Sequence, residues 1–368
     1  MSRLMVGFAA ALLAAMSAAP SPAEGKTAAA WTSPEATAVE TYIREAHFPV
    51  DMAWQLGTRT IFFTEKNTGK IRVAVRGRLL RRPCARLDVE SSYERGALGI
   101  ALHPEFEQNR YLYVYYSSGA VRDNRVARFV VDDNNRCRQK TVLIKGIPAA
   151  KHHQGGQIEF LDGYMFVSTG DVRRPWKAQN TAITPGKVLR YNADGSIPED
   201  NPFTSPEHPN PVWSYGHRNA FGLAARPGTS QLFESENGTT CGDEINLIEP
   251  GRNYGWGMGF PENCQGAGVG PDPIAPIYSW TQVIAPTDLT WYRGRIDALY
   301  DTLVVGDWIT GSIRSLRLSA DGRRVESAET FLRGSAPISD VHEGPGGWLY
   351  FLTMGSIKRI VEVPTSDP

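Results

Sequence analysis

Residues 348–359 read WLYFLTMGSIKR: an aromatic and aliphatic run, then a glycine, then an alternating apolar and basic segment. Alternation and a high aromatic and β-branched content indicate β-strands, and the glycine indicates a tight turn between two of them. Runs of this kind occur six times along the chain, at residues 60–64, 111–115, 164–168, 231–235, 302–306 and 348–352. Several are followed by a glycine and then an Ile-Arg or Ile/Val-x-Arg sequence, at residues 69–72, 186–190, 311–314 and 355–359.

The turns between the expected strands carry Asp-Gly or Gly-Gly pairs, at residues 162–163, 194–195, 321–322 and 346–347. Such pairs favour two-residue hairpins. Six copies at a spacing of roughly 45 to 70 residues are typical of four-stranded propeller blades with variable loops. A β-sandwich or β-helix would also show short strands, but six units of this size fit a six-bladed propeller better. We therefore predict an all-β, six-bladed β-propeller in one domain, residues 35–368, with a short helix near residues 35–45.

The composition is that of a globular protein, with 41% hydrophobic and 21% charged residues among 368. Glycine (36) and proline (25) are frequent, which favours short strands joined by turns. The formal net charge is zero, and no basic stripe or acidic tail is present, so we expect no nucleic-acid partner.

The N-terminus resembles a signal peptide over residues 1–23. Arg3 is followed by a short apolar run at residues 4–19, and Ala19 and Ala23 are candidate cleavage positions. The run is short for a membrane span of about 20 apolar residues, and no later segment is apolar enough to span. We expect an exported protein, periplasmic or secreted, with no membrane span.

Export makes the four cysteines candidates for disulfides, because disulfides persist in oxidising compartments. Three pairings are possible in principle. We favour Cys241–Cys264, which flank a short, turn-rich loop, and this leaves Cys84 to pair with Cys137.

Residues 216–222 (GHRNAFG), 236–246 (ENGTTCGDEIN) and 253–256 (NYGW) bring a fixed cation, carboxamides, carboxylates and glycines into one short region. A structural strand does not need this mixture. It indicates a site where backbone and polar side chains converge on an anionic ligand and a cation.

These segments, with residues 96–106, 152–160, 168–171, 186–190 and 197–203 in this order, resemble the soluble glucose/sorbosone dehydrogenase family, including periplasmic aldose sugar dehydrogenases. The resemblance runs from about Phe48 to Val363. It implies a six-bladed propeller that holds pyrroloquinoline quinone (PQQ) and calcium at the mouth of its channel. The implied enzyme is a quinoprotein that oxidises aldose sugars or related alcohols to lactones or acids and passes electrons to a soluble acceptor.

The resemblance also assigns roles to residues. His153, followed by Gln154-Gly155-Gly156, matches the family's general base, and imidazole suits proton removal near neutral pH. His152 is interpreted as a hydrogen-bonding residue. Arg218 and Asn219 match the family's cofactor pair, with Arg218 stabilising the charge of the reduced quinone.

Gly238 and Thr239 match positions whose backbone carbonyls bind the catalytic calcium, and a plain turn is the competing interpretation. Asp171 matches a residue that lines the substrate pocket, although an aspartate that ends a strand would look the same. Glu94 stands where the family has a glutamine near the substrate.

Three further positions depart from the family pattern, each at a place where the family has a cation. Ile309 replaces a lysine, and Pro337 and Ser339 replace the arginines of an Arg-x-Arg-Asp sequence. Those cations neutralise the carboxylates of PQQ. Two alternatives therefore remain: a non-catalytic propeller that binds a sugar or a protein partner at the channel mouth, and a calcium-dependent lactonase. The lactonase would need several carboxylates around the channel, and the sequence leads us to expect few.

Overall fold

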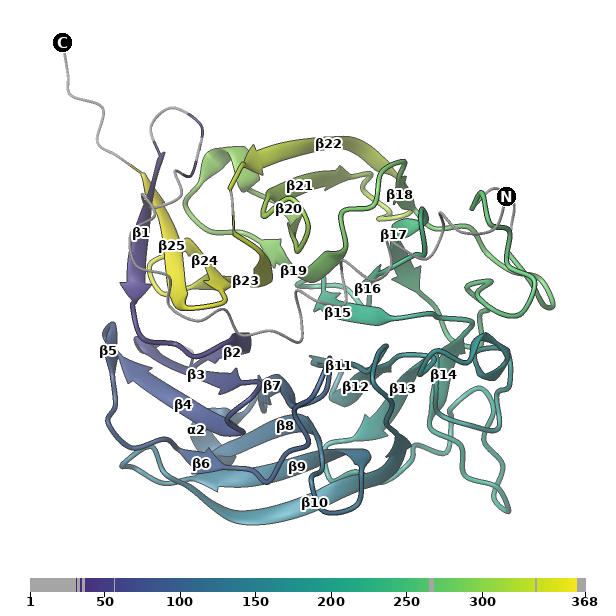
Figure 1. Cartoon of the computed structure of the whole chain (residues 1–368), viewed down its shortest axis with the longest axis horizontal. Helices are drawn as coiled ribbons and strands as arrows, with labels where there is room; N and C mark the ends of the chain where they lie inside the picture. Colours follow the sequence, from purple (N-terminus) through teal and green to yellow (C-terminus); the bar gives the residue numbers. More distant parts are fainter. Residues whose placement is uncertain are drawn as a thin grey trace.

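The computed structural model describes residues 31, 34, 37–55, 57–264, 268–334 and 336–362. The predicted signal peptide at residues 1–23 lies outside this part. Six antiparallel sheets form a ring around a central channel, which confirms the predicted all-β, six-bladed propeller (Figure 1). Helical structure in the described residues is confined to one short turn, α2 (Phe106–Asn109), and two 3-10 turns, η1 (Pro175–Lys177) and η2 (Asp297–Leu299). No described helix has the length and apolar character to cross a membrane.

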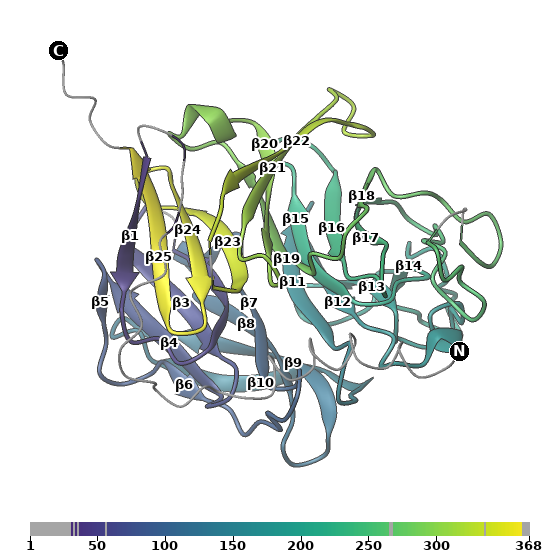
Figure 2. The same cartoon turned by 45° about the horizontal axis from the view of Figure 1, so that its top comes forward.

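The blades follow one another in sequence, and Figure 2 shows one of them, β11 to β14, running from the axis to the rim. Blade 1 comprises β2 (Pro49–Trp54), β3 (Thr60–Glu65), β4 (Lys70–Val75), β5 (Arg78–Leu79) and β6 (Ala85–Arg86). Blade 2 comprises β7 (Ala97–Leu102), β8 (Tyr111–Ser117), β9 (Asp123–Val131) and β10 (Cys137–Pro148). Blade 3 comprises β11 (Gly155–Leu161), β12 (Tyr164–Thr169), β13 (Lys187–Asn192) and β14 (Val212–Tyr215). Blade 4 comprises β15 (Ala220–Ala225), β16 (Leu232–Glu236), β17 (Asp243–Ile248) and β18 (Tyr278–Trp280). Blade 5 comprises β19 (Pro286–Tyr292), β20 (Thr302–Asp307), β21 (Ile313–Leu318) and β22 (Val325–Leu332). Blade 6 comprises β23 (Ile338–Gly344), β24 (Trp348–Thr353), β25 (Ser356–Glu362) and β1 (Thr37–Ile43).

The six aromatic runs found in the sequence form the second strand of each blade: β3, β8, β12, β16, β20 and β24. These strands are buried on both faces, because neighbouring blades cover them. Their side chains build apolar layers between blades, such as Phe62 of blade 1 against Leu112 and Val114 of blade 2. Each side chain of this size contributes about 1.5–3 kcal/mol when fully buried.

The hairpin turns follow from local chemistry. Asp162 and Gly163, between β11 and β12, have φ angles of 52° and 82°. Two successive positive φ values define the type I′ turn, whose twist matches that of the flanking strands.

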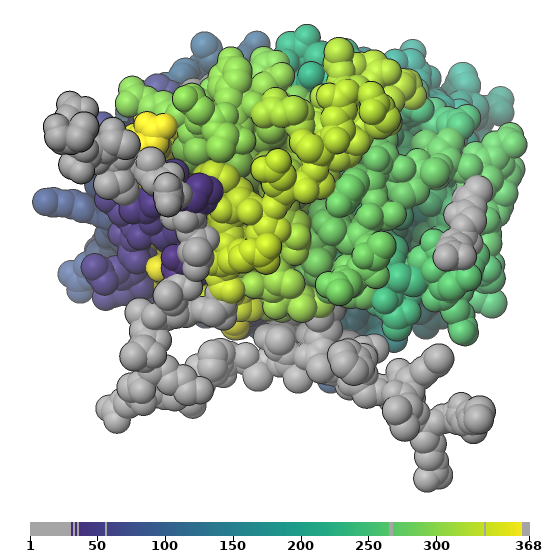
Figure 3. Space-filling model, turned by 90° about the horizontal axis from the view of Figure 1, so that it is seen from above, coloured from purple at the N-terminus to yellow at the C-terminus, as the bar shows by residue number. Residues whose placement is uncertain are grey.

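The helix expected near residues 35–45 is wrong. Residues Thr37–Ile43 form the strand β1, which pairs antiparallel with β25 and completes the last blade. Its alternating Thr37, Val39, Thr41 and Ile43 suit a strand, and pairing with the C-terminal strand closes the ring. The purple β1 therefore lies beside the yellow β25 in Figure 1, and in Figure 3 purple N-terminal residues border yellow-green residues from the C-terminal part of the chain.

Both preferred disulfides are present. Cys241–Cys264 closes the loop between β16 and β17 onto the segment after β17, and Cys84–Cys137 joins blade 1 to blade 2. No cysteine in the described residues is free.

Candidate active site

The sequence motifs meet at one end of the channel. His153 and Arg218–Asn219 precede the innermost strands β11 and β15, and Asp171 and Gly238–Thr239 follow the second strands β12 and β16. The innermost strands β2, β7, β11, β15, β19 and β23 contact one another in a closed ring. Segments that precede or begin these strands therefore converge, although they lie far apart in the sequence. They enclose a cavity, which we call the mouth cavity, whose wall includes Phe48, Lys66, Glu94, Asn219, Trp308 and Ser339.

His153 is held by a chain of hydrogen bonds at this mouth. Its Nδ1 lies 2.6 Å from Oδ1 of Asp171, and Oδ2 of Asp171 accepts a 2.8 Å hydrogen bond from Nε1 of Trp256. The Arg173 backbone N–H also donates to Asp171 Oδ1, over 2.7 Å. Asp171 is fully buried, so the structure places it behind His153 as its orienting partner.

The electrostatics keep His153 neutral and Asp171 ionised. Burial, followed by the positive charge of Arg218, lowers the pKa of His153 below its usual value. Burial alone would raise the pKa of Asp171, but the hydrogen bonds from His153 and Trp256 and the charge of Arg218 outweigh it, and the pKa falls. A carboxylate can only accept, so Nδ1 of His153 carries the proton and Nε2 carries the lone pair. This is the state a general base requires.

Glu94 ties both histidines to the mouth cavity. Its Oε1 lies 3.0 Å from Nδ1 of His152, and its Oε2 accepts a 2.5 Å hydrogen bond from the backbone N–H of His153. Burial would raise the pKa of Glu94, but the hydrogen bonds from the His152 side chain and the His153 backbone outweigh it, and the pKa falls. Glu94 thus presents a carboxylate to the mouth cavity, and His152 supports that carboxylate.

Arg218 lies next to this dyad. Its backbone carbonyl accepts a hydrogen bond from the Asp171 N–H (2.8 Å), and its NH1 group donates to the Asn237 carbonyl (2.8 Å). Its guanidinium lies 5.4 Å from the centre of the Trp256 ring. Its Nε atom is buried without a hydrogen-bond partner among the described residues. A buried donor without a partner costs about 1–3 kcal/mol, so this atom suits a ligand with acceptor oxygens.

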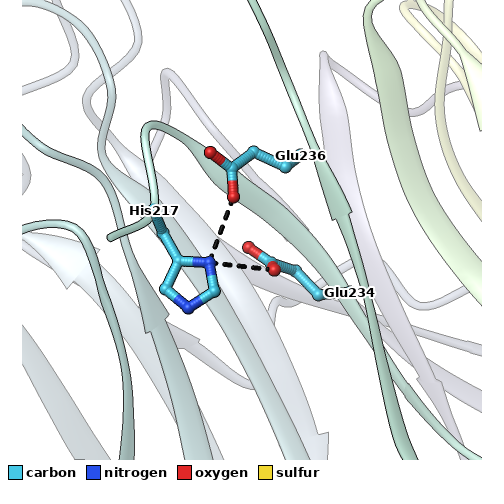
Figure 4. A group of neighbouring side chains, drawn as sticks. All are labelled: His217, Glu234 and Glu236. Carbon is cyan, nitrogen blue, oxygen red and sulfur yellow. Dashed lines mark hydrogen bonds and ion pairs between the residues drawn. The ribbon is translucent and has the colours of Figure 1, made fainter. Parts of the chain in front are cut away.

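Next to Arg218 in the sequence, the fully buried His217 lies against Glu234 and Glu236 (Figure 4). His217 Nδ1 lies 3.0 Å from Oε2 of Glu234 and 3.1 Å from Oε2 of Glu236. Oε1 of Glu236 accepts a 2.5 Å hydrogen bond from the Arg218 backbone N–H. Burial would lower the pKa of His217, but the charge of Glu234 and the hydrogen bonds that His217 donates to the two glutamates raise it to about 9. The cluster is therefore an ion pair that holds the loop bearing Arg218.

Asn219 connects the two halves of the predicted site. Its Oδ1 accepts from the Gly155 N–H (3.2 Å), and its Nδ2 donates to Oδ1 of Asn237 (2.9 Å), which precedes Gly238. The Gly238 N–H in turn donates to Asp243 over 2.8 Å. A Cβ atom at Gly238 would lie 2.0 Å from the Cys241 carbonyl oxygen, so the loop requires glycine there.

Thr239 is exposed on this loop, and its N–H donates to the Cys241 carbonyl (2.9 Å). Asp243 is buried and accepts three backbone N–H groups, those of Gly238, Ile284 and Ala285. Asp243 and the Cys241–Cys264 disulfide thus fix the conformation of the Gly238–Thr239 backbone, the predicted calcium ligand.

The three departures from the family pattern have different surroundings. Ile309 is 45% exposed, and Pro337 is half-buried. Ser339 lines the mouth cavity but donates its hydroxyl to the Pro49 carbonyl (2.9 Å). None of the three supplies a charge.

The structure adds a cation that sequence reasoning missed. Lys66, at the turn after β3, is 3% exposed and lines the mouth cavity. Its Nζ donates to Asn67 Oδ1 (3.1 Å) and to the Ser91 carbonyl (3.2 Å). Burial lowers the pKa of Lys66 to about 8, against the opposing effect of Glu94. In the sequence, Glu-Lys-Asn-Thr-Gly resembles any charged hairpin turn, and nothing there marked it as part of a site.

Comparison with known proteins agrees with this arrangement. The glucose/sorbosone dehydrogenase family profile matches residues 46–362. An uncharacterised protein of Synechocystis sp. is 35% identical over 337 residues, covering 83% of this chain and 81% of that protein. The aldose sugar dehydrogenase YliI of Escherichia coli is 28% identical over 364 residues, covering 92% and 95%. The PQQ-bound aldose sugar dehydrogenase of Streptomyces coelicolor superimposes with a TM-score of 0.75 at 26% identity, covering 90% of this chain and 100% of that one.

A six-bladed propeller with a histidine–carboxylate pair at its channel mouth, together with these matches, places the protein among the sugar oxidoreductases. It belongs to the glucose/sorbosone dehydrogenase family, and the resemblance stated from the sequence is confirmed.

Proposed function

We propose that this protein is an exported, PQQ- and calcium-dependent dehydrogenase that oxidises aldose sugars or related alcohols to lactones or acids. The observation that carries the proposal is the His153–Asp171–Trp256 chain beside Arg218 at the channel mouth. The named relatives support it: one is an aldose sugar dehydrogenase, and another is the PQQ-bound form of such an enzyme.

The residues present fit an anionic quinone. Arg218 Nε and Trp308 Nε1 are buried donors without a partner in the described part of the chain, and Trp308 lines the mouth cavity. PQQ offers carboxylate and carbonyl oxygens to such donors. Arg218, Asn219 and Lys66 would hold it, and the Gly238 and Thr239 carbonyls would contribute to its calcium.

Lys66 offers a cation for PQQ binding in a chain that lacks the family's lysine and arginines. A PQQ carboxylate in this cavity without a cation would carry an unmet desolvation cost. Lys66 supplies a charge-assisted donor from blade 1. We infer that it takes over part of the function of the residues replaced by Ile309 and Ser339.

In the reaction, His153 Nε2 takes the proton of the sugar's anomeric hydroxyl, and Asp171 stabilises the imidazolium that forms. When bound, PQQ supplies the two-electron acceptor for the hydride that leaves the same carbon. Glu94 accepts hydrogen bonds from sugar hydroxyl groups and orients the ring. Arg218 stabilises negative charge that develops at the mouth. Electrons then pass to a soluble acceptor.

Dye reduction in the presence of PQQ and calcium, with several aldoses, tests this function. We expect turnover by the wild type and its loss in His153→Ala, while His208→Ala, at an exposed histidine, keeps the wild-type rate. Wild-type protein that reduces no dye with any aldose would contradict the proposal. His153→Ala at the full wild-type rate would move the base elsewhere, with His152 the first candidate.

A calcium-dependent lactonase remains a second candidate because of one observation. Contrary to our expectation of few carboxylates, Asp51, Asp288 and Asp340 meet in the channel, and Asp51 and Asp288 also line the mouth cavity. Hydrolysis of an aldonolactone by PQQ-free, calcium-loaded protein would support this function. No hydrolysis above the buffer rate would exclude it.

A further inference from the structure

Three aspartates from three blades meet on the axis of the propeller. Asp51 comes from β2, Asp288 from β19 and Asp340 from β23, and they are 3%, 6% and 1% exposed. One carboxylate oxygen from each lies within 4.8 Å of the other two. The innermost strands of blades 1, 5 and 6 thus place three acids in one buried spot.

The cluster lies between two cavities of the channel. Asp51, Asp288 and Gln157 line the mouth cavity, and the same three residues line a second cavity further along the channel, with Glu159 and His342. A small hydrated ion can therefore approach the cluster from either side, although the carboxylates themselves are buried.

Among the described residues, no cation acts as a partner of the three aspartates. Burial raises the pKa of all three aspartates, and neighbouring carboxylates add to this effect for Asp288 and Asp340. His342 is neutral, because burial lowers its pKa to about 4. The carboxylate that attracts the Lys66 ammonium most strongly is Glu94, which lies outside this cluster.

Two oxygen atoms of the cluster are buried without a hydrogen-bond partner among the described residues: Asp288 Oδ1 and Asp340 Oδ2. The other contacts are well formed. Asp51 accepts from the N–H groups of Met52 (2.7 Å) and Ile100 (2.6 Å), and Asp288 Oδ2 accepts from Gln157 Nε2 (2.6 Å). These bonds orient the carboxylates and leave oxygens available. Oxygens that share one calcium lie at most about 5 Å apart, because each calcium–oxygen distance is about 2.3–2.6 Å. The observed spacing fits that limit.

We propose that Asp51, Asp288 and Asp340 form a divalent-cation site, occupied by calcium, that is separate from the calcium proposed at Gly238 and Thr239. The ion would join the innermost strands of blades 1, 5 and 6. Blades 1 and 6 meet through β2 and β23, beside the seam that β1 closes. The site therefore stabilises ring closure, and it needs neither PQQ nor substrate.

Calcium titration of PQQ-free protein, stripped with EDTA and desalted, tests this site. Calorimetry and metal analysis measure the number of calcium ions bound. We expect wild type to bind one more calcium ion than Asp288→Asn/Asp340→Asn. At calcium concentrations 100 times Kd, the wild-type Tm should rise by about 5 °C. The matched control is Glu159→Gln, which removes a neighbouring channel carboxylate outside the cluster and should keep the wild-type response.

Equal calcium binding by wild type and Asp288→Asn/Asp340→Asn would place the ion elsewhere and overturn the proposal. Wild type that neither binds calcium nor gains stability would also overturn it, and would show that the aspartates share protons instead. Should the double variant fail to fold, the single variant Asp51→Asn replaces it. We expect it to lose the same calcium binding and the same rise in Tm. Loss of dye reduction with retained calcium binding would count against the proposed enzyme and not against this site.

Discussion

Asp171 lies 2.6 Å behind the Nδ1 atom of His153, on the side away from the lone pair that a substrate proton needs. The bond joins the loop before β11 to the residues after β12, so blade 3 itself sets the tautomer of the base. The sequence led us to expect Asp171 in contact with substrate, and its complete burial favours the orienting role.

Asp171→Asn should lower kcat by about 10²- to 10⁴-fold, because an amide in this position no longer holds Nδ1 protonated. PQQ affinity and Tm should change little. Steady-state kinetics with a fixed aldose measure the effect. Trp256→Phe removes only one hydrogen bond to Asp171 and should cost less than Asp171→Asn. A kcat for Asp171→Asn within threefold of wild type would refute the orienting role.

The contribution of His217 to stability should fall as the pH rises from about 6.5 to about 9. The pKa of His217 is raised from 6.5 to about 9 in the folded state, so the folded protein keeps a proton that the unfolded chain has lost. The stabilisation is complete below pH 6.5 and disappears above pH 9. Urea unfolding at several pH values measures it. His217→Gln should flatten the decline, whereas His208→Gln, at an exposed position, should keep it.

Removal of the Cys241–Cys264 disulfide should destabilise the fold by about 3 kcal/mol, because it closes a loop of 23 residues in the unfolded chain. Cys241→Ser/Cys264→Ser should also weaken PQQ and calcium binding, since the bridge fixes the Gly238 loop. The control is Cys84→Ser/Cys137→Ser, which should lose stability but keep cofactor affinity. Equal PQQ and calcium affinities in the two double variants would show that the Cys241–Cys264 disulfide does not support cofactor binding.

Lys66→Met should weaken PQQ binding by about tenfold or more, because a desolvated carboxylate loses its charged partner. Ile309→Lys should strengthen it, and adding Ser339→Arg should strengthen it further. Tryptophan fluorescence quenching by PQQ measures all four proteins. Wild-type affinity should also fall above pH 8, where Lys66 loses its proton. Unchanged PQQ affinity in Lys66→Met would show that another donor binds the PQQ carboxylate.

The blade pattern was predictable because each second strand carries its own local signal, as in residues 164–168 with the Asp162–Gly163 turn. The strand β1 was not, since its only partner, β25, lies more than 300 residues away in the sequence. The conformation of such a short edge segment is decided by its pairing with a distant strand and not by the intrinsic propensity of its residues.

The candidate site also contains residues with a local sequence signal and residues that only the fold brings together. His153 and Arg218 lie within recognisable motifs, whereas nothing in residues 253–256 assigned an individual role to Trp256, which donates to Asp171. Asp51, Asp288 and Asp340 each look like an ordinary strand residue. Only ring closure brings them together, so no local pattern could have revealed the cluster.

The most direct test of the account is a single-turnover experiment on protein reconstituted with one equivalent of PQQ and calcium. On mixing with an excess of an aldose in the absence of dye, the absorbance of the oxidised quinone should disappear in wild type. In His153→Ala the quinone should bind but stay oxidised over the same period. Quinone that remains oxidised in wild type with every aldose, or is reduced equally fast in His153→Ala, would contradict the account.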